Sequence, residues 1–333
     1  MIRTGYATKN KTLSDTQDVH LCRSIPIHSV SSYGLDEGIK KLEELSLRNL
    51  ADLQKVLQWN KENNVRVFVL PTGLFPYAAD RYFGYSVKFA SEELSTIGKF
   101  VKKNKQRLVF HIPPDIAAGL LSDQSHHGII FLRFMNYVHT LITLLDLQKT
   151  VIVCSFSKVD ERFATLDNLQ SKLFSLPSHL RSYIALENDT FNFPISTLLP
   201  FCVVNDIPLV LNIHHEVVRL NVDFPPLHTI KAIERLWERL GKRCLMFYSE
   251  QLTSSGSMEE RLCRKSHITR LPMIFEENVH NSDVIILSDS YEQSCRDFLP
   301  RTHPTSMSSS HVFYEEMRKA RFKHGMKVLS DLP

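Results

Sequence analysis

Eight short runs of apolar, β-branched residues alternate with longer amphipathic segments along this sequence. Each run is apolar over most of its length, which is typical of strands in a parallel sheet covered by helices on both faces. The runs are IRTGYA (2–7), VRVFVLP (65–71), RLVFHI (107–112), TVIVCSF (150–156), YIALEN (183–188), PLVLNI (208–213), RCLMFYS (243–249) and SDVIILS (282–288). Eight such units favour closure into a TIM (β/α)8 barrel over an open α/β sheet.

The segments between these runs have the hydrophobic period of helices that cover a sheet. They span residues 42–64, 91–104, 128–148, 166–177, 194–206, 229–241 and 290–299. An α/β barrel in a chain of 333 residues commonly forms one domain. We therefore expect a single barrel domain over residues 1–300, followed by a basic, Ser-rich and loosely ordered tail over residues 301–333.

Composition excludes only extreme classes of protein. Hydrophobic residues make up 43% and charged residues 23% of the chain, and the formal net charge of +4 neither requires nor excludes nucleic-acid binding. The six cysteines are scattered without a C-x-x-C pair, which argues against a disulfide framework or a zinc ribbon. No apolar segment resembles a signal sequence or a membrane span. We expect an intracellular, soluble protein, cytoplasmic or nuclear, that binds no membrane.

Polar side chains stand at the carboxyl ends of several predicted strands, where TIM-barrel enzymes place their active sites. They are Asp80, His111, Cys154, Glu187, Asn212 and the adjacent pair His214 and His215. A buried, unpaired carboxylate is costly, which favours a site role for Glu187. Adjacent residues on a strand point to opposite faces, which leaves the role of His214 open. Asp80 fits a cap or turn better than a ligand, and Cys154 fits a small buried side chain better than a soft metal ligand.

Several longer motifs resemble one known family in order and spacing. They are GYATKNKTLS (5–14), RNLADLQKVLQWNKENNVRVFVLPTGLFPYA (48–78), YIALENDT (183–190), LLPFCVVNDIPLVLNIHHE (198–216) and YSEQ (248–251). This combination is similar to the UV-damage endonucleases, and the likeness runs from about residue 2 to about residue 300. The resemblance implies a metal-dependent TIM barrel of the xylose-isomerase-like type that incises DNA 5′ to a photolesion.

The resemblance also implies a set of metal ligands. His111, Glu187 and His215 match ligand positions of the family, and Glu187 is the expected catalytic residue. Asp80 falls near a further ligand position, and Asn212 stands where the family has an aspartate. The implied cofactor is a divalent metal ion, Mn²⁺ by family resemblance, which activates water against a phosphodiester.

Other positions depart from the family's pattern. Family histidines fall on Cys154 and Phe247, and a family glutamate falls on Leu287. Because ligand charge governs the affinity for hard cations, these losses leave enough ligands for one metal ion or none, not for a cluster. Tyr6 and Asn10 match positions that contact the damaged strand, which implies double-stranded DNA carrying UV lesions as the partner.

Three functions therefore compete. The first is a UV-damage endonuclease that works with one metal ion. The second is a catalytically inactive homologue that binds damaged DNA or a repair partner, and the third, weaker one is a single-metal barrel enzyme acting on a sugar or phosphate substrate. Because several ligands are lost together, we expect a protein that descends from UV-damage endonucleases but is catalytically inactive.

Overall fold

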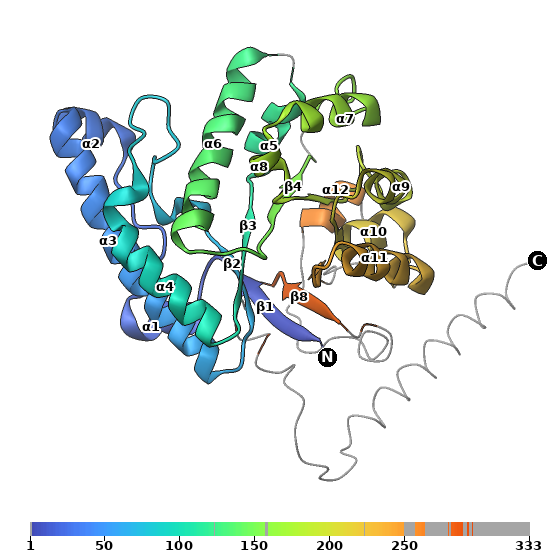
Figure 1. Cartoon of the computed structure of the whole chain (residues 1–333), viewed down its shortest axis with the longest axis horizontal. Coiled ribbons are helices and arrows are strands. Elements are labelled where there is room, and N and C mark those ends of the chain that lie inside the picture. Colours follow the sequence, from blue (N-terminus) through green and yellow to red (C-terminus); the bar gives the residue numbers. More distant parts are fainter. Residues whose placement is uncertain are drawn as a thin grey trace, which may run out of the picture. The chain divides into compact units, whose positions relative to one another are not determined.

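The strands form a closed parallel barrel in sequence order in the computed structural model of this chain (Figure 1). They are β1 (Arg3–Ala7), β2 (Val67–Leu70), β3 (Arg107–His111), β4 (Ile152–Ser155), β5 (Ile184–Glu187), β6 (Leu209–Asn212), β7 (Cys244–Tyr248) and β8 (Ser282–Ile286). β8 pairs with β1 and so closes the barrel. The structure describes residues 2–122, 124–156, 159–222, 224–249, 257–263, 279, 281–288, 292 and 295. The predicted TIM-barrel fold is confirmed.

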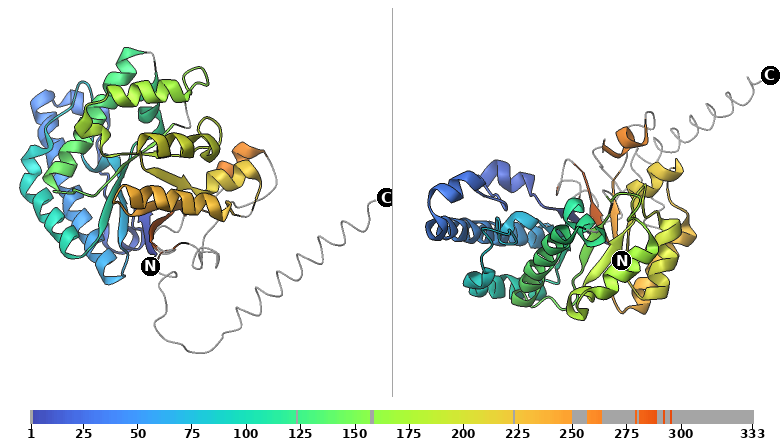
Figure 2. Two further views of the ribbon diagram at one scale, coloured as in Figure 1. Left: turned by 45° about the vertical axis from the view of Figure 1, so that its right-hand side comes forward. Right: turned by 90° about the horizontal axis from the view of Figure 1, so that it is seen from above.

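Helices surround these strands, as the three views in Figures 1 and 2 show. The described helices are α1 (Lys11–Gln17), α2 (Ile27–Ser32), α3 (Leu35–Glu62), α4 (Ser91–Lys103), α5 (Pro114–Leu121), α6 (Ser125–Leu144), α7 (Leu166–Ser175), α8 (Ser178–Arg181), α9 (Ile195–Asn205), α10 (Ile213–Leu220), α11 (Leu227–Arg239) and α12 (Met258–Cys263). Short 3₁₀ turns at Thr72–Leu74 and Val87–Ala90 join β2 to α4.

The strands are buried on both faces, which explains why they read as continuous apolar runs. Against their outer face, α11 contributes the fully buried Trp237, whose indole Nε1 donates a hydrogen bond of 2.6 Å to the Leu209 carbonyl. Inside the barrel, the register pairs Ser155 with Glu187. Because paired residues of neighbouring strands face the same side, this register brings polar strand ends together at one mouth.

The predicted strands agree with the observed ones to within two residues at each end. The predicted helices from residue 42 to residue 241 are also present, whereas the helix predicted over 290–299 lies mostly outside the described residues. One prediction is wrong: residues after Asn212 do not continue the strand but begin α10 at Ile213. The Asn212 side chain accepts a hydrogen bond from the His215 amide and so caps this helix.

The described residues all belong to one unit, Met1–Phe298. The tail predicted over residues 301–333 lies outside the described residues, so the boundary at residue 300 stays a prediction. Among the helices that the structure describes, none has the length and apolar character needed to cross a membrane.

Candidate functional site

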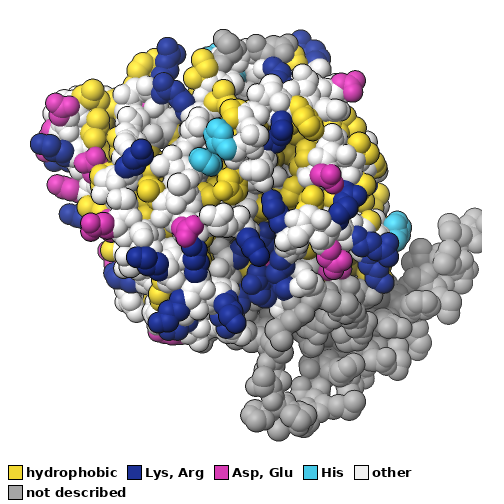
Figure 3. Space-filling model, in the orientation of Figure 1, with side chains coloured by type: hydrophobic (Ala, Val, Ile, Leu, Met, Phe, Trp, Pro, Cys, Tyr) yellow, Lys and Arg dark blue, Asp and Glu magenta, His cyan; other side chains and the backbone are white. Residues whose placement is uncertain are grey.

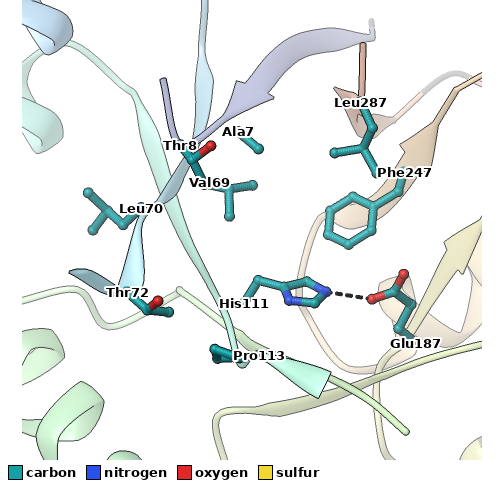
Figure 4. A pocket seen from close by; sticks show the side chains of 10 residues that line it. All are labelled: Ala7, Thr8, Val69, Leu70, Thr72, His111, Pro113, Glu187, Phe247 and Leu287. Atoms are coloured by element: carbon teal, nitrogen blue, oxygen red, sulfur yellow. Dashed lines mark hydrogen bonds and ion pairs between the residues drawn. The ribbon is translucent and has the colours of Figure 1, made fainter. Parts of the chain in front are cut away.

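Three polar side chains meet at the carboxyl ends of β3, β5 and β6. Glu187 lies between the other two, and each of its carboxylate oxygens contacts one partner. His111 Nε2 lies 2.7 Å from Oε2, and Asn212 Nδ2 donates a hydrogen bond of 2.7 Å to Oε1. Figure 4 shows the His111 ring pointing across the pocket toward the carboxylate. We call His111, Glu187 and Asn212 the Glu187 cluster.

The environment of Glu187 favours its charged form. Only 3% of the residue is exposed, and this burial alone would raise the pKa of its carboxyl group. The nearby charge and hydrogen bond of His111, the charge of His215 and the hydrogen bond from Asn212 outweigh burial, so that the pKa is lowered overall. The site therefore holds a buried carboxylate that hydrogen bonds from protein groups stabilise in its charged form.

The adjacent residues His214 and His215 both lie in α10, and their side chains point in different directions. His214 is buried, and its Nε2 lies 3.4 Å from the Leu262 carbonyl of α12, away from the barrel mouth. His215 is on the side of Glu187, and its Nδ1 lies 3.3 Å from the Asn188 carbonyl. On a helix, successive residues differ in direction by about 100°, which is why only one of the pair faces the cluster.

Asn188 is a supporting residue that the sequence did not single out. Its side-chain oxygen accepts a hydrogen bond of 2.7 Å from the Asn212 amide, and its Nδ2 donates one of 3.2 Å to the Asn212 carbonyl. This reciprocal pair joins the end of β5 to the end of β6. The available sequence signal was its position between Glu187 and Asp189, in the motif YIALENDT. The structure shows that Asp189 is buried as well.

A pocket of about 290 Å³ opens beside the Glu187 cluster. The Phe247 ring lies 5.6 Å from the His111 ring between centroids, and Leu287 stands next to it (Figure 4). Most of the remaining wall is apolar. The lining residues are Ala7, Thr8, Val69, Leu70, Thr72, His111, Pro113, Glu187, Phe247 and Leu287.

The donor set at this mouth is a poor one for a divalent metal ion. Among the described residues, no three or more His, Cys, Asp and Glu side chains are grouped so that they could hold a metal ion. The only carboxylate of the cluster already contacts a protein donor with each oxygen, and Phe247 and Leu287 add apolar surface where ligands would be needed. Hard cations bind more tightly as the number of anionic oxygen ligands rises, and the cluster offers one carboxylate.

The predicted ligand Asp80 and the strand-end residue Cys154 are not part of the cluster. Asp80 is in a turn, where its Oδ1 accepts hydrogen bonds from the Tyr82 and Phe83 amides at 2.7 and 2.9 Å, and it does not line the pocket. Cys154 is fully buried, and burial raises the pKa of its thiol. Cys154 is paired in register with Leu186, whereas Glu187 is paired with Ser155. Because successive strand residues point to opposite faces, Cys154 and Glu187 face opposite sides of the sheet. The surroundings of Asp80 and Cys154 suit the turn and the small buried side chain that the sequence favoured.

Tyr6 and Asn10, the predicted DNA contacts, form a buried network of their own. The Tyr6 hydroxyl donates a hydrogen bond of 2.7 Å to Asn60 Oδ1 and accepts one of 3.0 Å from Asn10 Nδ2. Asn10 Oδ1 accepts from the Leu13 amide and caps α1. Both residues are at least 98% buried, and the Tyr6 hydroxyl is engaged by protein groups, so their contact with DNA stays a prediction.

Comparisons with known proteins converge on one family. The family model "UV-endonuclease UvdE" matches residues 2–296. The UV-damage endonuclease of Schizosaccharomyces pombe is 25% identical over 97% of this chain and 55% of its own length. A putative UV-damage endonuclease of Acanthamoeba polyphaga mimivirus is 28% identical over 75% of this chain and 76% of its own length.

The fold comparison agrees with the sequence comparison. The crystal structure of SacUVDE superposes with a TM-score of 0.73 at 20% identity, over 89% of this chain and 96% of that chain. The chain spans about half the length of the fungal relative from Schizosaccharomyces pombe and 38% of that from Neurospora crassa. Because the family model covers nearly the whole described part of the sequence, the chain belongs to the UV-damage endonuclease family.

Proposed function

We propose that this chain binds double-stranded DNA carrying UV lesions, as its family implies, and that binding without metal-dependent incision is its activity. The observation that supports the second half is the closed hydrogen bonding of the Glu187 carboxylate by His111 and Asn212. A cation that entered would compete with both donors for the carboxylate oxygens. In return it would gain a single carboxylate, which is less anionic charge than proteins usually offer to hard cations.

Two observations support DNA as the partner. Membership of the family is the stronger one. The second is surface charge, since Lys and Arg supply the phosphate contacts on which DNA affinity depends. Figure 3 shows Lys and Arg side chains gathered in the lower half of the face drawn.

The second candidate is an endonuclease that uses one metal ion held by His111, Glu187 and His215. The position of His215 favours it, because its charge is close enough to Glu187 to lower the pKa of the carboxyl group. A metal bound there would supply the Lewis acidity that phosphodiester hydrolysis needs. Mn²⁺ is the ion that the family resemblance suggests.

The deciding experiment measures binding and incision on the same protein. Fluorescence anisotropy with an irradiated and an untreated duplex should give an affinity at least about tenfold higher for the irradiated one. In Mn²⁺, irradiated plasmid should stay supercoiled. Asp160→Asn, which changes an exposed carboxylate, is the control. Lesion-dependent nicking by the wild-type protein would refute the binding-only proposal and support the one-metal endonuclease, provided that Glu187→Gln abolishes the nicking and Asp160→Asn preserves it.

A further inference from the structure

A second charged cluster lies at the opposite end of the barrel, where the strands begin. Asp283 of β8 is fully buried, and three arginines converge on it. Arg3 comes from β1, Arg107 from β3, and Arg243 precedes β7. We call these four residues the basal arginine cluster.

The carboxylate of Asp283 has no acceptor capacity left. Its Oδ1 accepts from Arg3 Nε at 2.6 Å and Arg243 Nε at 2.7 Å, and its Oδ2 accepts from Arg3 Nη2 at 2.7 Å and Arg107 Nη1 at 2.8 Å. Four hydrogen bonds use all of its lone pairs. Any further donor in the cluster must find another acceptor.

Arg107 has two such donors. Its side chain is nine-tenths buried, and its Nε and Nη2 have no hydrogen-bond partner among the described residues. Its guanidinium carbon lies over the buried Trp237 ring, 5.6 Å from the ring centre, at cation–π distance. The Nη1 group is occupied by Asp283 and by the Arg243 carbonyl.

The geometry of these two donors identifies the kind of ligand. The Nε–H and Nη2–H bonds of a guanidinium are parallel and form the fork that grips two oxygens of one carboxylate or phosphate. Arg3 uses this same pair of atoms on Asp283. The part of the chain that the structure describes offers no acceptor to the Arg107 fork, and a buried charged donor without an acceptor is costly.

The charge balance favours a multiply charged anion. The three arginines converge on Asp283, and Glu234 lies near, accepting a hydrogen bond from Ser282 at 2.7 Å. Lys242 adds a further positive charge close enough to interact with Arg107. The pKa of Lys242 is lowered by burial and by the charge of Arg107, as expected beside an excess of positive charge. A dianion would neutralise that excess, whereas chloride offers no pair of oxygens to the fork.

We infer that the fork of Arg107 at the base of the barrel binds a phosphate-class oxyanion, at a site separate from the Glu187 cluster. The test is thermal unfolding in about 20 mM phosphate or sulfate against chloride of equal ionic strength. Phosphate should raise the melting temperature by about 3 °C if the dissociation constant is near 1 mM. Acetate, which has the fork geometry but half the charge, should raise it less.

Arg107→Met tests the assignment, because Asp283 keeps Arg3 and Arg243 as partners in this variant. This variant should lose the phosphate-dependent rise, whatever its melting temperature in chloride. Arg239→Met removes an arginine that pairs with Asp206 on the surface, and it should keep the rise. An equal melting temperature of the wild-type protein in phosphate and chloride, or an undiminished rise in Arg107→Met, would overturn the inference.

Binding of a duplex to Arg107→Met then identifies the source of the phosphate. If the site takes backbone phosphate, affinity falls and the slope of log affinity against log salt is reduced by about 1. If it takes free phosphate, duplex affinity is unchanged while the thermal effect is still lost. Both readouts are independent of incision, so failure here leaves the proposed function untouched.

Discussion

His111 Nε2 lies 2.7 Å from Glu187 Oε2 and joins the end of β3 to the end of β5 across the barrel mouth. Asn212 holds the other oxygen from β6, so one carboxylate ties three strand ends together. In a metal enzyme these strand ends would be tied by the ion. Here hydrogen bonds to the Glu187 carboxylate connect them instead.

Glu187→Gln should destabilise the fold. The amide of glutamine keeps the shape of the carboxylate but loses its negative charge. Its NH₂ group would face either His111 or Asn212, both of which donate to the carboxylate in the wild-type protein. The expected loss is about 1–3 kcal/mol in the free energy of unfolding, measured by urea denaturation. Asp160→Asn, whose carboxylate is exposed beside Arg162, should leave the denaturation midpoint unchanged. Equal midpoints for Glu187→Gln and the wild-type protein would show that the cluster contributes no stability.

The contribution of Glu187 should depend on pH with a definite sign. Its pKa is lowered in the folded protein, so its stabilising effect is fully present above the unfolded-state pKa of about 4.3 and is lost as pH falls through the folded-state value. The difference in unfolding free energy between wild type and Glu187→Gln should therefore be largest above about pH 5 and shrink toward about pH 3. A difference that grows on acidification would contradict this assignment.

Tyr6→Phe distinguishes a structural role from a DNA contact. Loss of the hydroxyl leaves Asn60 Oδ1 without its donor and Asn10 Nδ2 without its acceptor, both in a buried site. We expect a loss of about 1–3 kcal/mol in the free energy of unfolding, with affinity for irradiated DNA unchanged. Tyr82→Phe, at a tyrosine that is 72% exposed, is the control for stability. Weakened DNA binding with unchanged stability would restore Tyr6 as a DNA contact.

Asp283→Asn should be among the most destabilising single substitutions in this chain. It removes the carboxylate that Arg3, Arg107 and Arg243 share and leaves three guanidinium groups close together at a buried site. Breaking a buried ion pair by removing one partner costs about 3–5 kcal/mol. Chemical denaturation measures the loss, and a change within about 0.5 kcal/mol would mean that the cluster is solvated and weakly coupled.

The barrel could be predicted from the sequence because each strand is buried on both faces and therefore reads as an apolar run. Val67–Leu70 and Ile152–Ser155 are examples in which every residue is buried. The start of α10 could not be predicted from apolar content, since the apolar run continues from Leu209 through Ile213. Asn212 was a capping signal, but its place in a family motif drew it toward a ligand role.

The candidate site could be predicted only in part. His111, Glu187 and Asn212 were expected at one mouth because parallel strands end on the same side, and the structure brings them together. Asp80 was a looser expectation because a loop sets its position, and it lies in a turn. The burial of Tyr6 follows from its packing against Trp59 and Phe68, which are distant in sequence and which no local pattern reveals.

The most direct test of the account is a Mn²⁺ titration of the purified protein. Calorimetry measures the heat of binding, and electron paramagnetic resonance measures the concentration of free Mn²⁺. The wild-type protein should show no saturable binding up to about 1 mM. The Asn212→Asp, Phe247→His double variant places a carboxylate and an imidazole beside Glu187 and His111 and should gain saturable binding. One tightly bound Mn²⁺ per wild-type chain, lost in Glu187→Gln, would contradict the central claim.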